Sequence, residues 1–340
     1  MSLLNNYTNQ VRQLKLSQND SSEAFEIIMN GKAELEDLIL FLTSLNEFGI
    51  TEDHMIGAVN IMKDKMVKVD IPNNSIDTCG TGGDGKFSLN ISTAVAFVLS
   101  ALNIPVAKHG NRSITSNCGS ADVLKSLGIN IDFPTDRLTE CIHKTGICFM
   151  FAPFHHPAMK HVAEVRQVLG KKGIKTIFNM LGPLLNPGNV NKQIIGVFSE
   201  NVQDIYQKVF NQYKDKEAFI VLGNDGMDEL STLGKNKIIH NNECLFFDPL
   251  DIKIKRPLVE ELTGKTPDFN ASRIIDIFSG IKDSFYEIVS VNAALGLVLY
   301  RNLNLNNDNM TSCLTDVKMV LDDGSALNQV EKLKKFTKDL

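Results

Sequence analysis

The chain has 340 residues, of which 43% are hydrophobic and 22% charged, and its formal net charge at pH 7 is −5. These values are ordinary for a globular enzyme, and the acidic balance argues against a nucleic-acid-binding surface, which normally needs a basic face. We therefore do not expect nucleic acid as a partner. A membrane-spanning helix needs about 18 consecutive apolar residues, and no run of the sequence approaches this length, so we do not expect a membrane as a partner either.

Six cysteines, at positions 79, 118, 141, 148, 244 and 313, are scattered without a Cys-x-x-Cys pair. Their spacing predicts neither a zinc site nor a disulfide framework, and reduced thiols are typical of the cytoplasm. The first ten residues lack the charged and then apolar layout of a secretion signal. We therefore expect a cytoplasmic protein.

Residues 1 to about 70 show the spacing of several short helices. Ser22–Asn30 is expected to form one helix, the apolar residues from Leu35 onward follow helical spacing as far as Gly49, and Thr51 begins another helix. Strand patterns and phosphate-binding motifs do not occur in this stretch. We expect a small N-terminal helical domain over residues 1–70, packed on a larger domain.

From Ile76 onward, apolar runs typical of strands alternate with helical segments. This alternation predicts an α/β domain over residues 74–340, with a mostly parallel sheet flanked by helices. The predicted strands are Ile76–Thr78, Ile104–Ala107, Ile129–Phe133, Ile147–Phe151, Ile194–Phe198 and Ala218–Leu222, with a hairpin of Ile238–His240 and Leu245–Phe247. Pro157 is predicted to begin a helix that runs to Leu169, and the apolar segment near 176–190 is expected to return to the helical domain.

A glycine-rich loop follows the first predicted strand. Gly80, Gly82, Gly83 and Gly85 lie within six positions, ahead of a helix that Ser92 or Thr93 is predicted to cap. Glycine allows backbone conformations that other residues avoid, and a helix N-terminus offers unpaired N–H groups to an anion. A strand, a glycine loop and a helix start together predict a phosphate-binding site.

Two well-known phosphate motifs match this loop only in part. The spacing Gly80-x-Gly82-x-x-Gly85 fits a dinucleotide fingerprint, and Gly80-x₄-Gly85-Lys86 fits most of a P-loop. However, Phe87 stands where a P-loop has the Ser or Thr that binds magnesium. The second strand is followed by the cationic run KHGNR, from Lys108, rather than by the acid that would bind a ribose. The sequence thus favours a site for a second anionic group.

Five motifs occur in one order along nearly the whole chain: GTGGDG…NIST from Gly80, KHGNR from Lys108, HPAMK from His156, TIFNMLGPLLNP from Thr176 and GMDE from Gly226. In this set the sequence resembles the anthranilate phosphoribosyltransferases, the second enzymes of the tryptophan pathway. The resemblance implies transfer of the phosphoribosyl group of phosphoribosyl pyrophosphate (PRPP) to the amine of anthranilate, with Mg²⁺ as cofactor. It also implies a homodimer formed through the N-terminal helices.

Two alternatives share this fold. One is a pyrimidine nucleoside phosphorylase, whose loop carries a different glycine-serine pattern, and the other is a non-enzymatic relative that binds nucleic acid. The acidic balance and the intact acid pair of GMDE speak against the second alternative.

Backbone N–H groups, hydroxyls and a cation suit the pyrophosphate end of PRPP. On this chemistry and on the resemblance, Lys108 is the predicted counter-charge, and hydroxyls and amides form the rest of the rim. The predicted PRPP-binding residues are Gly80, Thr81, Gly83, Asp84, Ser88, Asn90, Ile91, Ser92, Thr93, Lys108, Asn111, Ser113, Thr115, Ser116 and Ser120.

Asp228 and Glu229 follow the strand Ala218–Leu222 and a glycine turn. By themselves they could be a solvated acidic turn, but in the resembling family this pair holds metal, and Mg²⁺ prefers carboxylate and other oxygen ligands. Ser92 is predicted as a further magnesium ligand.

Arg166 matches the arginine that binds anthranilate in the family, since a guanidinium can bind a carboxylate through two hydrogen bonds. Gly80 and Asn111 are expected to line the same pocket. The aromatic amine of anthranilate is already neutral at physiological pH, so no dedicated catalytic acid or base is predicted. The spacing of His109, His155 and His156 matches no common zinc site, and the last two are expected to be pocket or packing residues.

One segment departs from the family. Ahead of TIFN the chain carries Lys171-Lys172-Gly173, apparently as an addition, and Lys175 stands at the place of an arginine. The added residues could form a cationic loop that attracts anthranilate, or a helix cap whose lysines are favoured by the helix C-terminus.

Deleting residues 171–173 distinguishes these two alternatives. If a cationic loop attracts anthranilate, the deletion raises the KM for anthranilate and weakens its salt dependence, because exposed charges are screened over about 8–10 Å at physiological ionic strength. The KM for PRPP changes little, and Arg166→Ala has a far larger effect on anthranilate. Steady-state kinetics at two salt concentrations measure this, and unchanged KM values would leave residues 171–173 as a cap only.

Overall fold

A computed structural model describes residues 3–82, 85–112 and 118–338. It divides into two compact units, of which the first comprises Met1–Lys68 with Ala152–Pro187 and the second Val69–Phe151 with Gly188–Leu340. The first unit thus takes in a longer returning segment than the predicted one near 176–190, and the domain limits of 1–70 and 74–340 remain a prediction.

Within the described residues, no helix combines the length and the apolar character that crossing a membrane requires.

The first unit is helical throughout. Its elements are α1 (Asn5–Arg12), α2 (Gln18–Met29), α3 (Leu35–Phe48), α4 (Glu52–Asp64), α8 (Ala152–His155) and α9 (Ala163–Lys171), with 3-10 turns at Pro157–Val162, Ile177–Asn179 and Gly182–Leu185. The ring of Phe25 packs edge-to-face on Phe41 and on Phe178, with centroid distances of 6.1 and 5.9 Å. Since Phe178 belongs to the returning segment, this aromatic cluster joins that segment to α2 and α3.

Residues 171–173 form a helix cap. Lys171 ends α9, and Gly173 has a φ of +71°. The N–H of Gly173 donates to the carbonyl oxygen of Gly170 at 2.9 Å, and that of Ile174 donates to Leu169 at 3.0 Å. These two bonds define a Schellman motif, in which glycine adopts the left-handed conformation at low cost. The structure therefore gives the cap rather than an extended loop. The helix predicted from Pro157 to Leu169 is also divided, into a 3-10 turn and α9.

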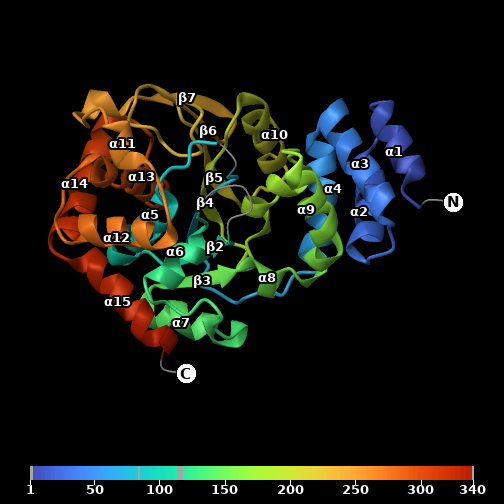
Figure 1. Ribbon diagram of the computed structural model, residues 1–340. Coiled ribbons are helices and arrows are strands. Elements are labelled where there is room, and N and C mark those ends of the chain that lie inside the picture. Colours follow the sequence, from blue (N-terminus) through green and yellow to red (C-terminus); the bar gives the residue numbers. More distant parts are fainter. Residues whose placement is uncertain (1–2, 83–84, 113–117, 339–340) are drawn as a thin grey trace. The chain divides into compact units, whose positions relative to one another are not determined.

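The second unit is built on a seven-stranded sheet (Figure 1). The strand order is β3-β2-β1-β4-β5-β6-β7. The first five strands are parallel, and β6 and β7 pair antiparallel at one edge. The strands are β1 (Ile76–Gly80), β2 (Val106–Gly110), β3 (Ile147–Phe151), β4 (Lys192–Gly196), β5 (Glu217–Leu222), β6 (Asn236–His240) and β7 (Glu243–Phe247). The predicted α/β class and mostly parallel sheet are confirmed.

The strand predicted at Ile129–Phe133 is wrong, because this segment joins no strand of the sheet. Ile129, Ile131 and Phe133 are buried, whereas the two residues between them are exposed. A loop that buries every second side chain therefore shows the same alternation as a strand. The predicted hairpin is present, and its turn residues Asn241 and Asn242 both have positive φ, as a two-residue hairpin turn of this kind requires.

Helices cover the sheet and bring the site residues to its edge. They are α5 (Ile91–Ala101), α6 (Ser120–Ser126), α7 (Leu138–Thr145), α10 (Glu200–Phe210), α11 (Val259–Leu262), α12 (Pro267–Phe278), α13 (Ser284–Tyr300), α14 (Asn307–Asp322) and α15 (Ser325–Lys338). The apolar α13 packs against both α5 and the sheet, with Gly296 in contact with Leu99 and Ile194. Figure 1 shows α12 to α15, in orange and red, gathered beside α5.

Candidate functional site

The site lies in the second unit, where the carboxyl ends of β1, β2, β4 and β5 meet. In an open parallel sheet the loops after the strands converge at this edge, and ligands bind there. The glycine loop follows β1, KHGNR ends β2, and the acid pair follows β5.

The glycine loop is tied down at both of its ends. Thr81 donates to the carbonyl oxygen of Gly196 through its N–H at 2.9 Å and through its hydroxyl at 3.2 Å. After the loop, the N–H of Leu89 donates to Leu262 at 2.9 Å, and the carbonyl oxygen of Phe87 accepts from Gly264 at 2.7 Å. The loop is thus held between the end of β4 and the segment that follows α11. Gly83 and Asp84, both predicted site residues, lie outside the described residues.

The acid pair faces the anion-binding groups of the loop and of α5. A carboxylate oxygen of Asp228 accepts from the N–H of Gly82 at 2.8 Å, and one of Glu229 accepts from the N–H of Ser92 at 3.2 Å. Ser92 lies in the first turn of α5, whose N-terminus favours negative charge. Asp228, Glu229 and Ser92, which were predicted together as magnesium ligands, are therefore neighbours in the structure.

Two glycines make room for Asp228. A Cβ atom on Gly196 would lie 1.5 Å from the carbonyl oxygen of Asp228, and one on Gly80 would lie 2.2 Å from its carboxylate. Both glycines are the last residues of their strands. Only glycine at these two strand ends lets the acid come this close.

Two buried asparagines hold the residues that follow the acid pair. The side-chain amide of Asn292, on α13, accepts from the N–H of Leu230 and donates to its carbonyl oxygen, both at 2.9 Å. The side chain of Asn236 accepts from the N–H of Ser231 at 2.9 Å and from that of Asn224 at 3.2 Å. Because both ends of the 224–231 loop are bonded, its backbone is fixed on the sheet.

Lys108 brings a buried positive charge to the same place. Its side chain is only 3% exposed, and its ammonium group donates to the carbonyl oxygen of Thr78 and to the hydroxyl of Ser92, the latter at 3.3 Å. The hydroxyl of Ser92 thus accepts from Lys108, while its backbone N–H donates to Glu229. A buried cation beneath a helix N-terminus suits a polyanionic ligand.

The structure corrects the predicted cap of α5 and shows where α6 begins. Asn90, rather than Ser92 or Thr93, is the N-cap of α5, and its side chain makes no capping hydrogen bond. Ile91 begins that helix, and the buried Thr93 hydroxyl has no hydrogen-bond partner among the described residues. Ser120 is the first residue of α6, where its hydroxyl donates to the carbonyl oxygen of Asn111 at 3.4 Å.

The other predicted PRPP residues are only partly described. Asn111 is exposed at the end of the KHGNR run, and Ser88 forms an isolated bridge with Thr263. Ser113, Thr115 and Ser116 lie outside the described residues.

Arg166 belongs to the first unit. It is half-buried on α9, and its guanidinium lies 6.0 Å from the centroid of the Phe178 ring. Burial lowers the pKa of Arg166, but an arginine remains charged at physiological pH. His155 and His156, in the same unit, are buried. Burial lowers the pKa of both, that of His156 to about 4, and the neighbouring His155 contributes to the shift of His156.

Comparison with known proteins identifies the family. Residues 72–327 match the model described as "Glycosyl transferase family, a/b domain". The chain is 42% identical to the anthranilate phosphoribosyltransferase of Pelagibacter ubique over 288 residues, which cover 84% of this chain and 86% of that protein. It is 38% identical to that of Petrotoga mobilis, over 96% of this chain and 94% of that protein.

The chain belongs to the anthranilate phosphoribosyltransferase family. The solved anthranilate phosphoribosyltransferase from Saccharomyces cerevisiae in complex with PRPP and Mg superposes with a TM-score of 0.92 at 27% identity, over 99% of this chain and 98% of that one. The Thermus thermophilus enzyme gives 0.89 at 29% identity, over 97% and 99%. The predicted family and its transferase class, which transfers a pentosyl group, are confirmed.

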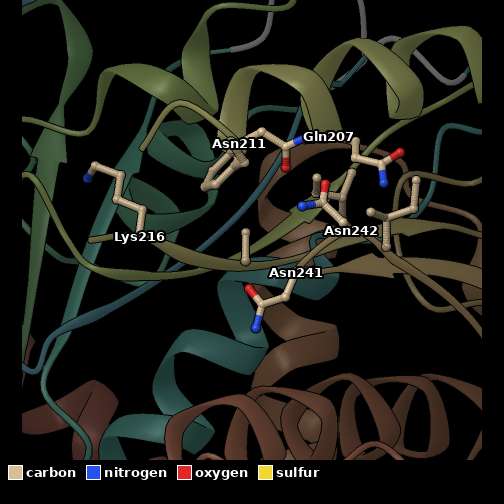
Figure 2. Close-up of a pocket in the computed structure, with 9 residues that line it drawn as sticks. Gln207, Asn211, Lys216, Asn241 and Asn242 are labelled. Atoms are coloured by element: carbon tan, nitrogen blue, oxygen red, sulfur yellow. The ribbon is translucent and has the colours of Figure 1, made fainter. Parts of the chain in front are cut away.

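Two polar cavities lie elsewhere in the second unit. One is lined by Gln207 and Asn211 at the end of α10, Lys216, and the hairpin turn Asn241–Asn242 (Figure 2). The other is lined by residues 69–73 and 188–191, which precede β1 and β4. Neither is lined by a predicted site residue, and both lie toward the edge of the sheet opposite the carboxyl ends of the parallel strands.

Replacing Gly196 with alanine tests the close approach of Asp228. Because the new methyl group would overlap a backbone atom, the acid pair must move, and kcat/KM is expected to fall by about 100-fold or more. Overpacking should also lower the free energy of unfolding, by about 1–3 kcal/mol.

Gly170→Ala is the matched control, since nothing lies within 4 Å of its Cβ position, and helical alanine stabilises by about 0.5–1 kcal/mol relative to glycine. Steady-state kinetics and thermal unfolding measure both variants. Wild-type kinetics in Gly196→Ala would show that the position of Asp228 against β4 does not matter for activity.

Proposed function

We propose that this chain transfers the phosphoribosyl group of PRPP to the amine of anthranilate with release of pyrophosphate, the second step of tryptophan synthesis from chorismate. The observation that carries the proposal is the convergence of Lys108, the first turn of α5, Gly82 and the acid pair at one edge of the sheet. This donor and charge set suits a pyrophosphate better than any uncharged ligand.

In this reaction the bond between the anomeric carbon and the pyrophosphate oxygen breaks, and a bond to the anthranilate nitrogen forms. The amine then loses a proton to solvent. Lys108 and the N–H groups of the glycine loop and of α5 hold the leaving group, whose negative charge grows as the bond breaks. Holding the two substrates in line supplies the other main part of the rate enhancement.

Magnesium fits the residues present. The described residues contain no group of three or more His, Cys, Asp or Glu side chains that could enclose a metal ion. Mg²⁺ does not need such a cage, because it usually takes one or two carboxylates together with phosphate oxygens and water. Asp228, Glu229 and the Ser92 hydroxyl offer oxygen donors of this kind, and the ion would neutralise charge on the pyrophosphate.

We also propose that Arg166 binds the carboxylate of anthranilate and that Gly80 and Asn111 contribute to anthranilate binding. The cation–π contact of Arg166 with Phe178 supports this role, because it restricts where the guanidinium lies. Mixing the protein with Mg²⁺, PRPP and anthranilate and following the loss of anthranilate fluorescence tests the whole proposal. Unchanged fluorescence, with phosphorolysis of thymidine or uridine instead, would favour the nucleoside phosphorylase alternative.

The proposal includes a homodimer formed through the N-terminal helices and a cytoplasmic location. Leu3, Leu14, Leu40 and Phe48 are exposed apolar side chains of the first unit, which suits a contact between copies. None of the six cysteines, all of which lie in the described residues, forms a disulfide, which suits a reducing compartment. Sedimentation of the full chain measures its oligomeric state, and a monomer at micromolar concentration would contradict the proposed homodimer.

Removing both acids tests the metal assignment. The double variant Asp228→Ala with Glu229→Ala is expected to lose activity at every magnesium concentration, while circular dichroism shows an intact fold. The control replaces another adjacent pair, Glu52 and Asp53 in the first turn of α4, with alanine. A double variant at 228 and 229 that keeps the wild-type magnesium dependence would refute the assignment.

The pH dependence tests the absence of a catalytic base. We expect kcat to stay nearly flat from about pH 7 to 9, because the amine is already neutral. A fall in kcat with a pKa near 6.5 that disappears on mutation of His109 or His156 would indicate a histidine base.

The free energy of unfolding should fall as the pH is lowered from about 6.5 to 4. In this range His156 binds a proton in the unfolded chain, where its pKa is the ordinary 6.5, but not in the folded protein, where its pKa is about 4. Above pH 6.5 His156 is neutral in both the folded and the unfolded chain, so its protonation no longer lowers the free energy of unfolding.

A further inference from the structure

Asn270, near the start of α12, connects the glycine-loop region to the segment after α11. Its side chain is only 1% exposed. Its carbonyl oxygen Oδ1 accepts from the backbone N–H of Lys265 at 3.0 Å, and its amide nitrogen Nδ2 donates to Oδ1 of Asn90 at 2.8 Å. Asn270 was not among the residues predicted from the sequence, since its partner Asn90 lies 180 positions away.

The first of these bonds determines the orientation of the second. A backbone N–H can only donate, so Asn270 must turn its oxygen to Lys265 and its nitrogen to Asn90. Asn90 must then present its own oxygen to Asn270. The amide nitrogen of Asn90 is therefore directed away from Asn270, and the bond between Lys265 and Asn270 alone determines this orientation.

The amide nitrogen of Asn90 has little other use in the fold. Although Asn90 occupies the N-cap of α5, its side chain does not cap the helix. Its Nδ2 lies 3.5 Å from the carbonyl oxygen of Cys118, at the outer limit of a hydrogen bond. One N–H of this amide is thus weakly bonded to Cys118, and the other has no partner among the described residues, beside the first turn of α5 and close to Ser92.

The backbone around this pair of asparagines is rigid. The hydrogen bonds of Leu89 with Leu262 and of Phe87 with Gly264 join the same two segments. A Cβ atom on Gly264 would lie 2.5 Å from the carbonyl oxygen of Ser88, so the segments are in direct contact. The spacing between Asn270 and Asn90 is therefore set by the backbone.

We propose that Asn270 is a positioning residue for PRPP, which holds Asn90 so that its amide donors, and not its oxygen, face the phosphate oxygens. The inference rests on the proposed function. An amide free to rotate would present its oxygen to the anion in part of the population, where it would repel the ligand rather than bind it. A hydrogen bond to a charged group is stronger than one between neutral groups, so the orientation affects affinity directly.

The substitution Asn270→Asp reverses the polarity with almost no change of shape. One carboxylate oxygen still accepts from Lys265, while the other faces Oδ1 of Asn90 and favours a flipped Asn90 amide. We expect the Kd for PRPP in the presence of Mg²⁺, measured by titration calorimetry, to rise by about 10- to 100-fold. Asn270→Ala removes the restraint without reversing it, and the expected rise is smaller, about 3- to 10-fold. The KM for anthranilate should stay within about twofold in both variants, since a group acting through Asn90 alters only PRPP binding.

A larger effect of Asn270→Asp than of Asn270→Ala on the Kd for PRPP is the reverse of what a purely structural role would give. If Asn270 served only to hold the fold, the isosteric aspartate would be milder than alanine both in thermal unfolding and in PRPP binding. We expect aspartate to be the milder substitution for unfolding and the harsher one for PRPP binding. Equal or milder effects of Asn270→Asp on the Kd would overturn the proposal.

A double-mutant cycle separates orientation from the added negative charge. In an Asn90→Ala background, neither Asn270→Asp nor Asn270→Ala should change the Kd for PRPP further. An undiminished effect of Asn270→Asp in that background would mean that simple charge repulsion is responsible, and would also overturn the proposal. If Asn270→Asp does not fold, the Asn270→Ala arm still tests the coupling, and an effect of Asn270→Ala that persists in the Asn90→Ala background would overturn the proposal. Wild-type protein that fails to bind PRPP would instead reject the proposed function, so the two failures are distinguishable.

Discussion

The close contact of Asp228 with the ends of β1 and β4 is the constraint on which the site depends. The Cα atoms of Gly80 and Gly196 leave room for the backbone and the carboxylate of one acid, and the neighbouring acid reaches the first turn of α5. Any side chain at either glycine would push the 224–231 loop away from the glycine loop. Lys108 and Ser92 are linked to this loop through Glu229, which accepts from the N–H of Ser92.

The charges of the site are arranged in layers. Lys108 lies buried beneath Ser92, the N–H groups of Gly82 and Ser92 lie at the sheet edge, and the carboxylates of the acid pair face them. A polyanion meets backbone dipoles and a buried cation on one side and requires a metal ion to approach the carboxylates on the other. Buried asparagines, which carry no charge, orient these groups without altering the local charge balance.

Local chemistry made much of this predictable from the sequence. The glycine loop follows β1, KHGNR includes the end of β2, and the acid pair lies in the loop after β5. Because parallel strands bring their carboxyl ends together, these short motifs were enough to predict a common site. The prediction of a strand at Ile129–Phe133 was wrong because this loop packs on the core and buries alternate side chains without pairing with another strand. Asn270, Asn292 and Gly196 could not be predicted, because their roles come from partners far away in the sequence: Asn90 lies 180 positions from Asn270, and Leu230 lies 62 positions from Asn292. An asparagine within an amphipathic helix pattern carries no local signal of such a partner.

The long sequence separation of the contacts within the site has a consequence for folding. The bond between Gly82 and Asp228 spans 146 positions, and that between Ser92 and Glu229 spans 137. Contacts of such high order form only after β1, β4 and β5 have been brought into register, because closing so long a loop costs entropy that must be recovered by the sheet. The amide hydrogens of Gly82 and Ser92 should therefore become protected from solvent exchange late, with the completion of the second unit. A protein built in this way gains these contacts and its finished fold in the same event, so a partly folded chain lacks the arrangement of charges that the complete sheet edge presents.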